Sequence, residues 1–168
     1  EITAEGPHLL HVDADRRIAP QAARQAVIDA VHETGGFIVV CHPNWEADFD
    51  HCPLARMREW QGYVGLEICN GTIGRLDGSP YALDKWDMLL AAGRRLWGFA
   101  HDDSHLPADD VELAWNVAYV TDPTPAGVVA ALRAGRSYGS TGVEITNIQV
   151  ADSRIRIETA NAQRIVAV

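Results

Sequence analysis

The amino-acid sequence predicts an α/β fold with a mostly parallel sheet or barrel, followed by a short antiparallel β segment. Two observations lead to this class. Continuous apolar runs, typical of buried parallel strands, alternate with stretches of helical periodicity that stop at glycine. Three short alternating runs then end the chain, as expected for antiparallel strands. At 168 residues we expect one domain over residues 1–142, with residues 143–168 as a β extension packed on it.

The expected elements follow each other in βα order. Strands are predicted at residues 8–12, 37–41, 63–69, 96–100 and 113–120. Helices are predicted from Pro20 through Val31, and at residues 53–60, 81–92 and 125–134. Residues 72–80 are expected to form a polar loop, and the terminal strands are expected at residues 143–150, 155–159 and 164–168.

Composition limits the classes of partner. The net charge is −9 and Lys85 is the sole lysine, so the surface should repel nucleic acid, which argues against a DNA-binding module. No apolar run is long enough to span a membrane. The three cysteines Cys41, Cys52 and Cys69 form neither a CxxC zinc pattern nor a disulfide framework. Buried free thiols favour a reducing, cytoplasmic location.

The stretch from Arg95 to Pro107 carries several potential metal ligands at the end of one apolar strand. Two histidines and two carboxylates occur within residues 101–105, and imidazole and carboxylate are ligands for Mn, Fe and Zn. His101 and His105 are four residues apart, so they would share a face if the segment were helical. Alternatively the segment is a loop in which Asp103 and His105 form a D-x-H pair. Pro107 and the lack of helical periodicity favour the loop.

Polar residues also end the two preceding apolar strands. His42 follows residues 37–41 and is succeeded by Pro43, which cannot continue a central strand. Glu67 lies inside an apolar run, where a carboxylate needs a partner. Right-handed crossovers place the carboxyl ends of parallel strands on one face. We therefore expect His42, Glu67, Asp103 and His105 to converge on one metal site.

Four short runs together resemble the PHP family, the polymerase and histidinol phosphatase-type metallohydrolases. They are EIT with GPH in residues 1–8, GFIVVCHP at 36–43, GLEICNG at 65–71 and DSH at 103–105. The run AALRAGRSYGSTGVEI at residues 130–145 is also similar to small stand-alone members, including phosphoesterases and carbaryl-hydrolase-like enzymes.

The resemblance implies a distorted (β/α)7 barrel holding two or three divalent ions such as Mn, Zn or Fe. The family's opening H-x-H motif and the first strands would precede Glu1. We therefore expect this chain to be about the C-terminal two-thirds of such an enzyme. The missing N-terminal segment of the same protein would then be a partner, and an uncovered sheet edge could also lead to a homo-oligomer.

Position by position, the resemblance implies metal ligands at Glu1, His8, His42, Asp103 and His105, of which His42, Asp103 and His105 are the catalytic candidates. Supporting or pocket positions are assigned to a second set: Asn44, Trp45, Glu67, His101 and Asp102. Alternatives remain at two positions, because His11 competes with His8 and Asp102 competes with Asp103. His51 and Cys52 look like a ligand pair but have no partner motif, so neither is assigned to the site.

The function implied is hydrolysis of a small-molecule phosphate ester by metal-activated water, without a covalent protein nucleophile. An ester or carbamate substrate is the alternative within the same chemistry. A degenerate, non-catalytic PHP module is the alternative from another class. The H-P and D-x-H motifs count against the degenerate module because both are intact.

Overall fold

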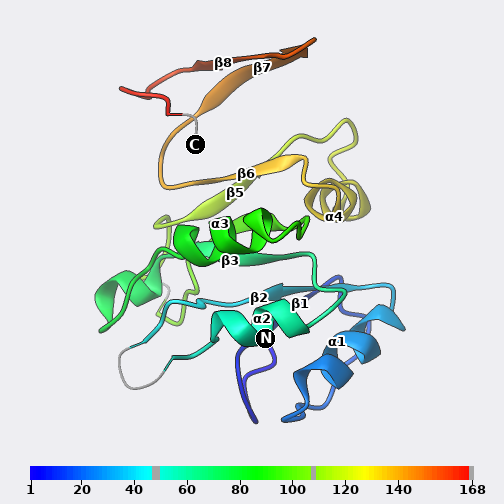
Figure 1. The fold of residues 1–168 in the computed structure, drawn as a ribbon. Coiled ribbons are helices and arrows are strands. Elements are labelled where there is room, and N and C mark those ends of the chain that lie inside the picture. Colours follow the sequence, from blue (N-terminus) through cyan, green and yellow to red (C-terminus); the bar gives the residue numbers. More distant parts are fainter. Residues whose placement is uncertain (47–49, 107–108, 167–168) are drawn as a thin grey trace.

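The computed structural model describes residues 1–46, 50–106 and 109–166. Its elements are ordered as follows (Figure 1): β1 (Leu9–Val12), α1 (Arg24–His32), β2 (Phe37–Val40), α2 (Leu54–Glu59), β3 (Gly65–Asn70), the 3-10 helix η1 (Thr72–Arg75), α3 (Leu83–Ala91), β4 (Trp97–His101), β5 (Trp115–Ala118), α4 (Pro125–Arg133), β6 (Ser137–Ser140), β7 (Ile145–Ala151) and β8 (Arg154–Thr159).

A four-stranded sheet, in the order β1-β2-β3-β4, forms the centre of the molecule. Strands β2, β3 and β4 are parallel, whereas β1 runs antiparallel to β2. Because the carboxyl ends of β2, β3 and β4 lie side by side, the residues that follow them meet at one edge of the sheet.

The expected (β/α)7 barrel is wrong. In the described part of the chain the strands form this sheet and two separate antiparallel pairs, β5-β6 and β7-β8, and no barrel closes. At β4 the amide side chain of Asn116 takes the place of a backbone partner. Ala100 N donates to its Oδ1 (3.1 Å), and its Nδ2 donates to Ala100 O (2.8 Å). The backbone groups of Ala100 are thereby satisfied by a side chain instead of by a continuing ladder.

Both faces of the central sheet are covered, as the continuous apolar run of β2 requires. Ile38 and Val40 belong to a cluster with residues of α1, α2 and α3, including Val27, Met57 and Leu89. The alternate residues Phe37 and Val39 pack with Phe99 and with residues of α4. Side chains in a strand point alternately to opposite faces, so one tetrapeptide joins two hydrophobic layers.

Several element boundaries differ from the sequence-based expectation. The first helix begins at Arg24 rather than near Pro20, and the loop after β3 contains the 3-10 helix η1. Strand β6, Ser137–Ser140, was not predicted because Ser-Tyr-Gly-Ser shows no apolar alternation. Of the last expected strand, residues 164–166 are not a strand and residues 167–168 lie outside the described part.

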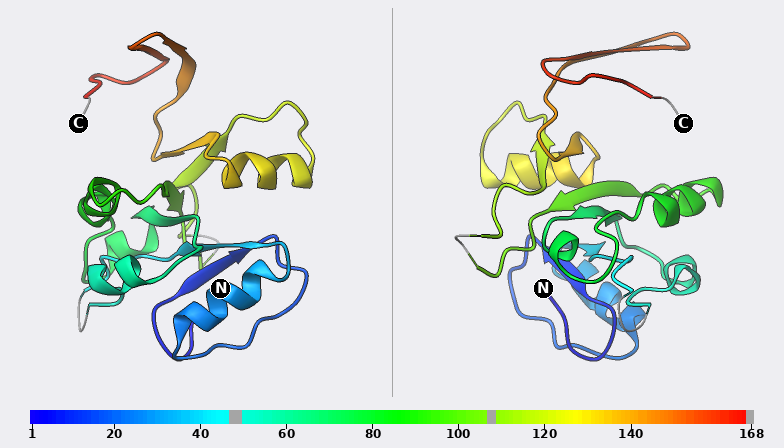
Figure 2. Two further views of the ribbon diagram at one scale, coloured as in Figure 1. Left: turned by 45° about the vertical axis from the view of Figure 1, so that its right-hand side comes forward. Right: turned by 90° about the vertical axis from the view of Figure 1, so that its left-hand side faces the viewer.

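The hairpin β7-β8 lies beyond the β5-β6 pair, on the side away from the central sheet (Figure 2). Its link to β6 is held by Ile145 N, which donates to Tyr138 Oη at 2.9 Å. None of the helices in the described ranges combines the length and the apolar character that a membrane crossing needs.

Candidate metal centre

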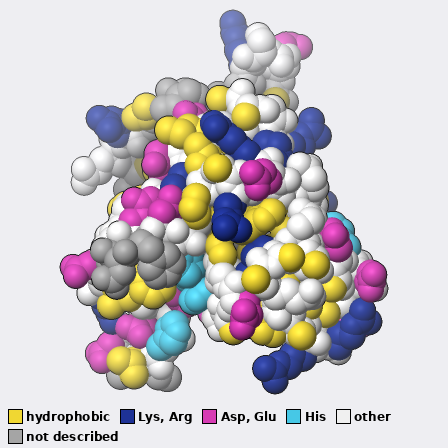
Figure 3. Space-filling view, turned by 60° about the horizontal axis from the view of Figure 1, so that its bottom comes forward, with side chains coloured by type: hydrophobic (Ala, Val, Ile, Leu, Met, Phe, Trp, Pro, Cys, Tyr) yellow, Lys and Arg dark blue, Asp and Glu magenta, His cyan; other side chains and the backbone are white. Residues whose placement is uncertain are grey.

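A cavity of about 670 Å³ opens at the carboxyl ends of the parallel strands. Its lining includes all five residues predicted as ligands: Glu1, His8, His42, Asp103 and His105. His42 lies just beyond β2, Asp103 and His105 lie just beyond β4, and Glu1 and His8 come from the segment before β1. On the face shown in Figure 3, histidine side chains lie at a hollow bordered by acidic and apolar side chains.

Arg24 folds the N-terminal segment back onto the sheet. Arg24 is 1% exposed as a whole residue, and its guanidinium donates hydrogen bonds to five backbone carbonyls, those of Thr3, Ala4, Gly6, Pro7 and Gln21. A backbone bridge between Ile2 and Leu9 closes the same loop. Glu1 and His8 are thus brought together, with Glu1 Oε1 2.9 Å from His8 Nδ1.

The Glu1 carboxylate also reaches His42, whose Nε2 lies 3.6 Å from Glu1 Oε1. The contacts with His42 and His8 hold the pKa of Glu1 well below its usual range, against the opposing effect of burial. Burial by itself would lower the pKa of His42, but the contact with Glu1 and the charges of Glu67 and Asp103 raise it overall. The carboxylate and the imidazoles are therefore electrostatically coupled.

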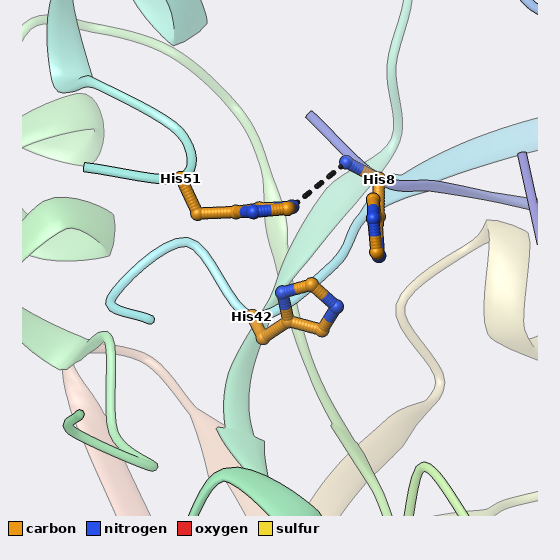
Figure 4. A group of neighbouring side chains, drawn as sticks. All are labelled: His8, His42 and His51. Carbon is orange, nitrogen blue, oxygen red and sulfur yellow. Dashed lines mark hydrogen bonds between the residues drawn. The ribbon is translucent and has the colours of Figure 1, made fainter. Parts of the chain in front are cut away.

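His51 joins this group, although its sequence context does not indicate a ligand. Ligand atoms of His8, His42 and His51 all lie within 4.8 Å of one another (Figure 4). The His51 ring lies 4.4 Å from the His8 ring and 4.6 Å from the His42 ring, centroid to centroid, and stacks on Trp45 at 5.4 Å. No motif indicated this position, because His51 comes from the long loop between β2 and α2.

One nitrogen of His51 is already engaged, because His8 N donates to His51 Nε2 at 3.0 Å. A neutral imidazole that accepts at Nε2 carries its hydrogen on Nδ1. Burial, followed by the nearby His42 and His8, lowers the pKa of His51 to about 3, so its ring is neutral. In this arrangement His51 fixes the backbone at His8, while Glu1, His8 and His42 present the ligand atoms.

Glu67 connects the ends of three parallel strands from behind the cavity. Its Oε2 accepts from His42 N (2.6 Å) and from Asn70 Nδ2 (2.9 Å), and its Oε1 lies 2.7 Å from His101 Nδ1. The residue is 4% exposed. His42 has φ +26°, a left-handed conformation that costs energy for a residue other than glycine. The bond to Glu67 helps to hold it there.

The loop after β4 is held by side chains that contact its backbone carbonyls. Asp103 has φ +54°, and the Thr72 hydroxyl, with its single hydrogen, lies within hydrogen-bond distance of the carbonyls of both Asp102 (3.0 Å) and Asp103 (2.9 Å). His105 Nδ1 lies 2.7 Å from Asp103 O. Since a carbonyl can only accept, Nδ1 carries the hydrogen and Nε2 keeps its lone pair, the tautomer typical of metal-ligating histidines. The segment is therefore a loop, as favoured from the sequence.

Asn70 ties Asp103 to the same network. Asn70 Nδ2 also donates to Asp103 Oδ2 at 3.3 Å. Burial is the main cause that raises the pKa of Asp103, partly opposed by the bond from Asn70, while the negative charges of Glu67 and Glu1 raise it further. A nearby cation would remove this penalty, since opposite charge favours the ionised carboxylate.

Of the residues predicted to support the site or border its pocket, only one lines the cavity. Trp45 lines the cavity, whereas Asn44, Glu67, His101 and Asp102 are not among its lining residues. Asp102 accepts hydrogen bonds from three backbone amides, those of Glu112, Leu113 and Ala114, and so orders the chain before β5. Asn44 Nδ2 donates to Tyr81 O and Asp84 Oδ1.

His11, the competitor of His8, is placed elsewhere. Its Nε2 lies 3.2 Å from Thr34 Oγ1, and it is not among the residues that line the cavity. His8 and His11 thus differ in surroundings although both belong to one short run.

The donor set fits divalent cations. It combines carboxylates with imidazoles, the ligands that Mn²⁺, Fe²⁺ and Zn²⁺ accept. His42 Nδ1 is buried and has no hydrogen-bond partner in the described ranges. A buried nitrogen without a partner is costly, and a bound cation would satisfy it. Several carboxylates close together, here Glu1, Asp103 and Glu67, likewise favour a positive charge between them.

Comparison with known families finds no match for this sequence, and comparison with curated proteins finds none either. The fold is similar to part of the crystal structure of a two-domain protein from Bacteroides vulgatus ATCC 8482, which contains a predicted PHP-like metal-dependent phosphoesterase. The TM-score is 0.60 and the identity 14%; the match covers 96% of this chain and 53% of that one. The present chain spans about half the length of that protein, and at this identity the likeness concerns the fold alone.

Proposed function

We propose that this protein is a metal-dependent hydrolase, and specifically a phosphoesterase that acts on a small phosphate ester. The observation that carries the proposal is the gathering of Glu1, His8, His42, Asp103 and His105, from three separate segments, in the lining of one cavity. The fold shared with a protein that contains a predicted PHP-like metal-dependent phosphoesterase agrees with this proposal.

Two groups of residues would hold divalent ions. Glu1, His8 and His42, beside the end of β2, form the first, and Asp103 with His105 Nε2, beyond the end of β4, forms the second. Bound divalent ions would lower the pKa of water, polarise the phosphoryl oxygen and neutralise charge in the transition state. They would also compensate for the acidic lining, which by itself repels a phosphate.

The chain's own residues position these groups. Glu67 holds the backbone of His42 and, through Asn70, the carboxylate of Asp103. Thr72 holds the carbonyls of Asp102 and Asp103. Such partners behind the ligands commonly change metal affinity or activity by about 10–100-fold when removed. In the hydrolysis itself, an oxygen of water becomes bonded to phosphorus, the P–O ester bond breaks, and the leaving oxygen takes up a proton.

Hydrolysis of a carboxyl ester or carbamate is the second candidate, because the same donor set can polarise a carbonyl. Apolar side chains also line the cavity, namely Trp45, Ile73, Leu76 and Leu106, and would accept an aromatic leaving group. A non-catalytic module would keep the fold and metal ions without turnover.

The test is hydrolysis of p-nitrophenyl phosphate by the purified protein with added Mn²⁺, with and without EDTA. We expect metal-dependent turnover that Asp103→Asn lowers by more than about a hundredfold, because a charged ligand is lost while the shape is kept. Asp87→Asn, on the exposed face of α3, is the matched control.

Each alternative predicts a different outcome of the same assay. Metal-dependent turnover of p-nitrophenyl acetate or an aryl carbamate, but not of the phosphate, would favour the second candidate. Retained metal without any turnover would favour the non-catalytic module. Normal metal content and turnover in Asp103→Asn would contradict the role given to the D-x-H pair.

A further inference from the structure

Four carboxylates line the cavity, those of Glu1, Asp103, Asp109 and Asp110. Against them, Arg75 is the one lysine or arginine side chain among the described lining residues. An anionic substrate entering this cavity therefore meets a negative lining with a single fixed cation. A cation in such a place affects which anions bind, since arginine is suited to pair with carboxylate and phosphate.

Arg75 is held next to the loop that carries the D-x-H pair. It ends η1, and its Nη1 donates to Asp110 Oδ1 in an ion pair. The other oxygen of Asp110 accepts from His105 N (3.3 Å) and Leu106 N (3.0 Å). The Asp110 side chain is 8% exposed, so a buried carboxylate fixes the guanidinium and the His105 backbone relative to each other.

The guanidinium still has donors to offer. Arginine carries five N–H groups, and in the described part of the chain only the one that points to Asp110 has a partner. The side chain is 43% exposed while it lines the cavity, so the remaining donors are open to a ligand. An oxyanion with two oxygens in one plane matches this fork.

The cavity has room for more than the group being hydrolysed. Its volume of about 670 Å³ falls within the range typical of sites for whole organic ligands, roughly 300–1,000 Å³. Apolar side chains occur in the same lining, including Trp45, Ile73 and Leu76. Leu76 is next to Arg75 in the sequence and Ile73 is two residues before it, so the cavity lining combines apolar side chains with a nearby cation.

We propose that Arg75 binds a second anionic group, a carboxylate or a phosphate, on the organic part of the substrate. The inference rests on the phosphoesterase function proposed above and specifies its substrate class. The substrate is a phosphate ester with an apolar body that carries a further oxyanion. Asp110 acts as the positioning residue, because it orients the guanidinium and keeps it at the cavity.

If Arg75 had only a structural role, its replacement would have different effects. If Arg75 only braced the His105 loop through Asp110, its replacement would lower stability or metal content and would weaken all ligands alike. A recognition role instead changes the ratio between ligands with one and with two anionic groups. The ratio is therefore the quantity to measure.

The experiment is isothermal titration of the Mn²⁺-loaded protein with phenylphosphonate, with 3- and 4-phosphonobenzoate, and with 1,4-phenylenediphosphonate. Phosphonates resist hydrolysis, so binding is measured without turnover. We expect at least one carboxylate ligand and the diphosphonate to bind about tenfold more tightly than phenylphosphonate, as for a charge-assisted hydrogen bond at a partly exposed site. The carboxylate and phosphonate arms distinguish the two kinds of second group.

Arg75→Met and Arg75→Gln should abolish this ratio, and Arg75→Lys should restore part of it because lysine keeps the charge but lacks the fork. Arg58→Met, an exposed arginine of α2 outside the cavity, should keep the full ratio. Circular dichroism and metal content verify that each variant is folded and loaded. Equal affinities of the wild type for all the phosphonates, or a ratio that survives in a folded Arg75 variant, would overturn the inference.

Aryl phosphate hydrolysis, measured in parallel, separates this inference from the proposed function. Discrimination among phosphonates without any hydrolysis supports the Arg75 subsite and contradicts the phosphoesterase. Hydrolysis without discrimination contradicts the subsite and leaves the phosphoesterase standing. Neither binding nor hydrolysis would overturn both.

Discussion

Replacing Glu67 should weaken the fold and the metal site together. The side chain is 4% exposed and interacts with His42 N, Asn70 Nδ2 and His101 Nδ1, one group from the end of each parallel strand. Glu67→Ala would remove all three interactions and leave two buried N–H groups without their acceptor, that of His42 N and one of the two on Asn70 Nδ2, the other of which keeps Asp103.

The magnitude follows from these two donors. A buried donor without an acceptor costs about 1–3 kcal/mol, so Glu67→Ala should lower the free energy of unfolding by about 2–6 kcal/mol. That is a large fraction of the roughly 5–15 kcal/mol typical of a domain. Glu67→Gln keeps one oxygen that can face His42 N and Asn70 Nδ2, so we expect a smaller loss of about 1–2 kcal/mol.

The assay is urea unfolding of the metal-free protein in EDTA, followed by circular dichroism at 222 nm. Glu59→Ala and Glu59→Gln are the matched controls, because Glu59 is an exposed residue of α2, and each should stay within about 0.5 kcal/mol of the wild type. Mn²⁺ affinity of Glu67→Gln should fall by about 10–100-fold. If the free energy of unfolding of Glu67→Ala equals that of the controls, the Glu67 side chain does not hold the ends of the three strands together.

Two further predictions concern the surroundings of the cluster. Lys85 donates hydrogen bonds to the carbonyls of Pro43 (2.7 Å) and Cys52 (3.2 Å), so Lys85→Met should lower the free energy of unfolding by about 2–4 kcal/mol in urea melts. Lys85→Arg should lower it less. Equal stability of Lys85→Met and wild type would contradict this prediction. The pKa of Glu1 is lowered from 4.5 on folding and that of His42 is raised from 6.5, so their pairing stabilises the metal-free fold fully only above pH 4.5 and below pH 6.5. The stability difference between wild type and Glu1→Gln should therefore be largest between these pH values and shrink on both sides, and a difference independent of pH from 3 to 9 would refute the pairing.

The meeting of the ligand candidates could be predicted because it depends on local sequence signals. The apolar strand 37–40 ends abruptly before His42, and β4 leads directly into Asp103 and His105. Parallel strands with right-handed crossovers then bring such ends to one edge. The loop at residues 102–105 could be predicted for the same reason, since no helical period runs through it. Whether these side chains bind metal stays a prediction.

His51 could not be found from the sequence because its position depends on long-range contacts. Lys85, from α3, holds the carbonyls at both ends of its loop, and Trp45 stacks on its ring. Neither contact leaves a periodic pattern or a motif near residue 51. His51 and Cys52 look like a ligand pair in the sequence, but no partner motif accompanies them in the loop before α2.

The barrel was wrong for a related reason. Strand direction is not encoded in an apolar run, and β1 runs antiparallel to β2. Asn116 satisfies the outer edge of β4 with a side chain, and β5 pairs instead with β6, whose sequence lacks a strand pattern. The repeated βα order thus indicated parallel neighbours but not closure of the sheet.

Measured metal content would show whether the group of Glu1, His8 and His42 binds a divalent ion. Wild type, His42→Ala and His32→Ala would be loaded with Mn²⁺ or Zn²⁺, desalted and measured by mass spectrometry. His32 is the control because it lies on α1, exposed and outside the cavity. We expect bound metal in wild type and His32→Ala and its loss in a folded His42→Ala. Wild-type protein without metal, or His42→Ala with undiminished metal, would contradict metal binding by this group.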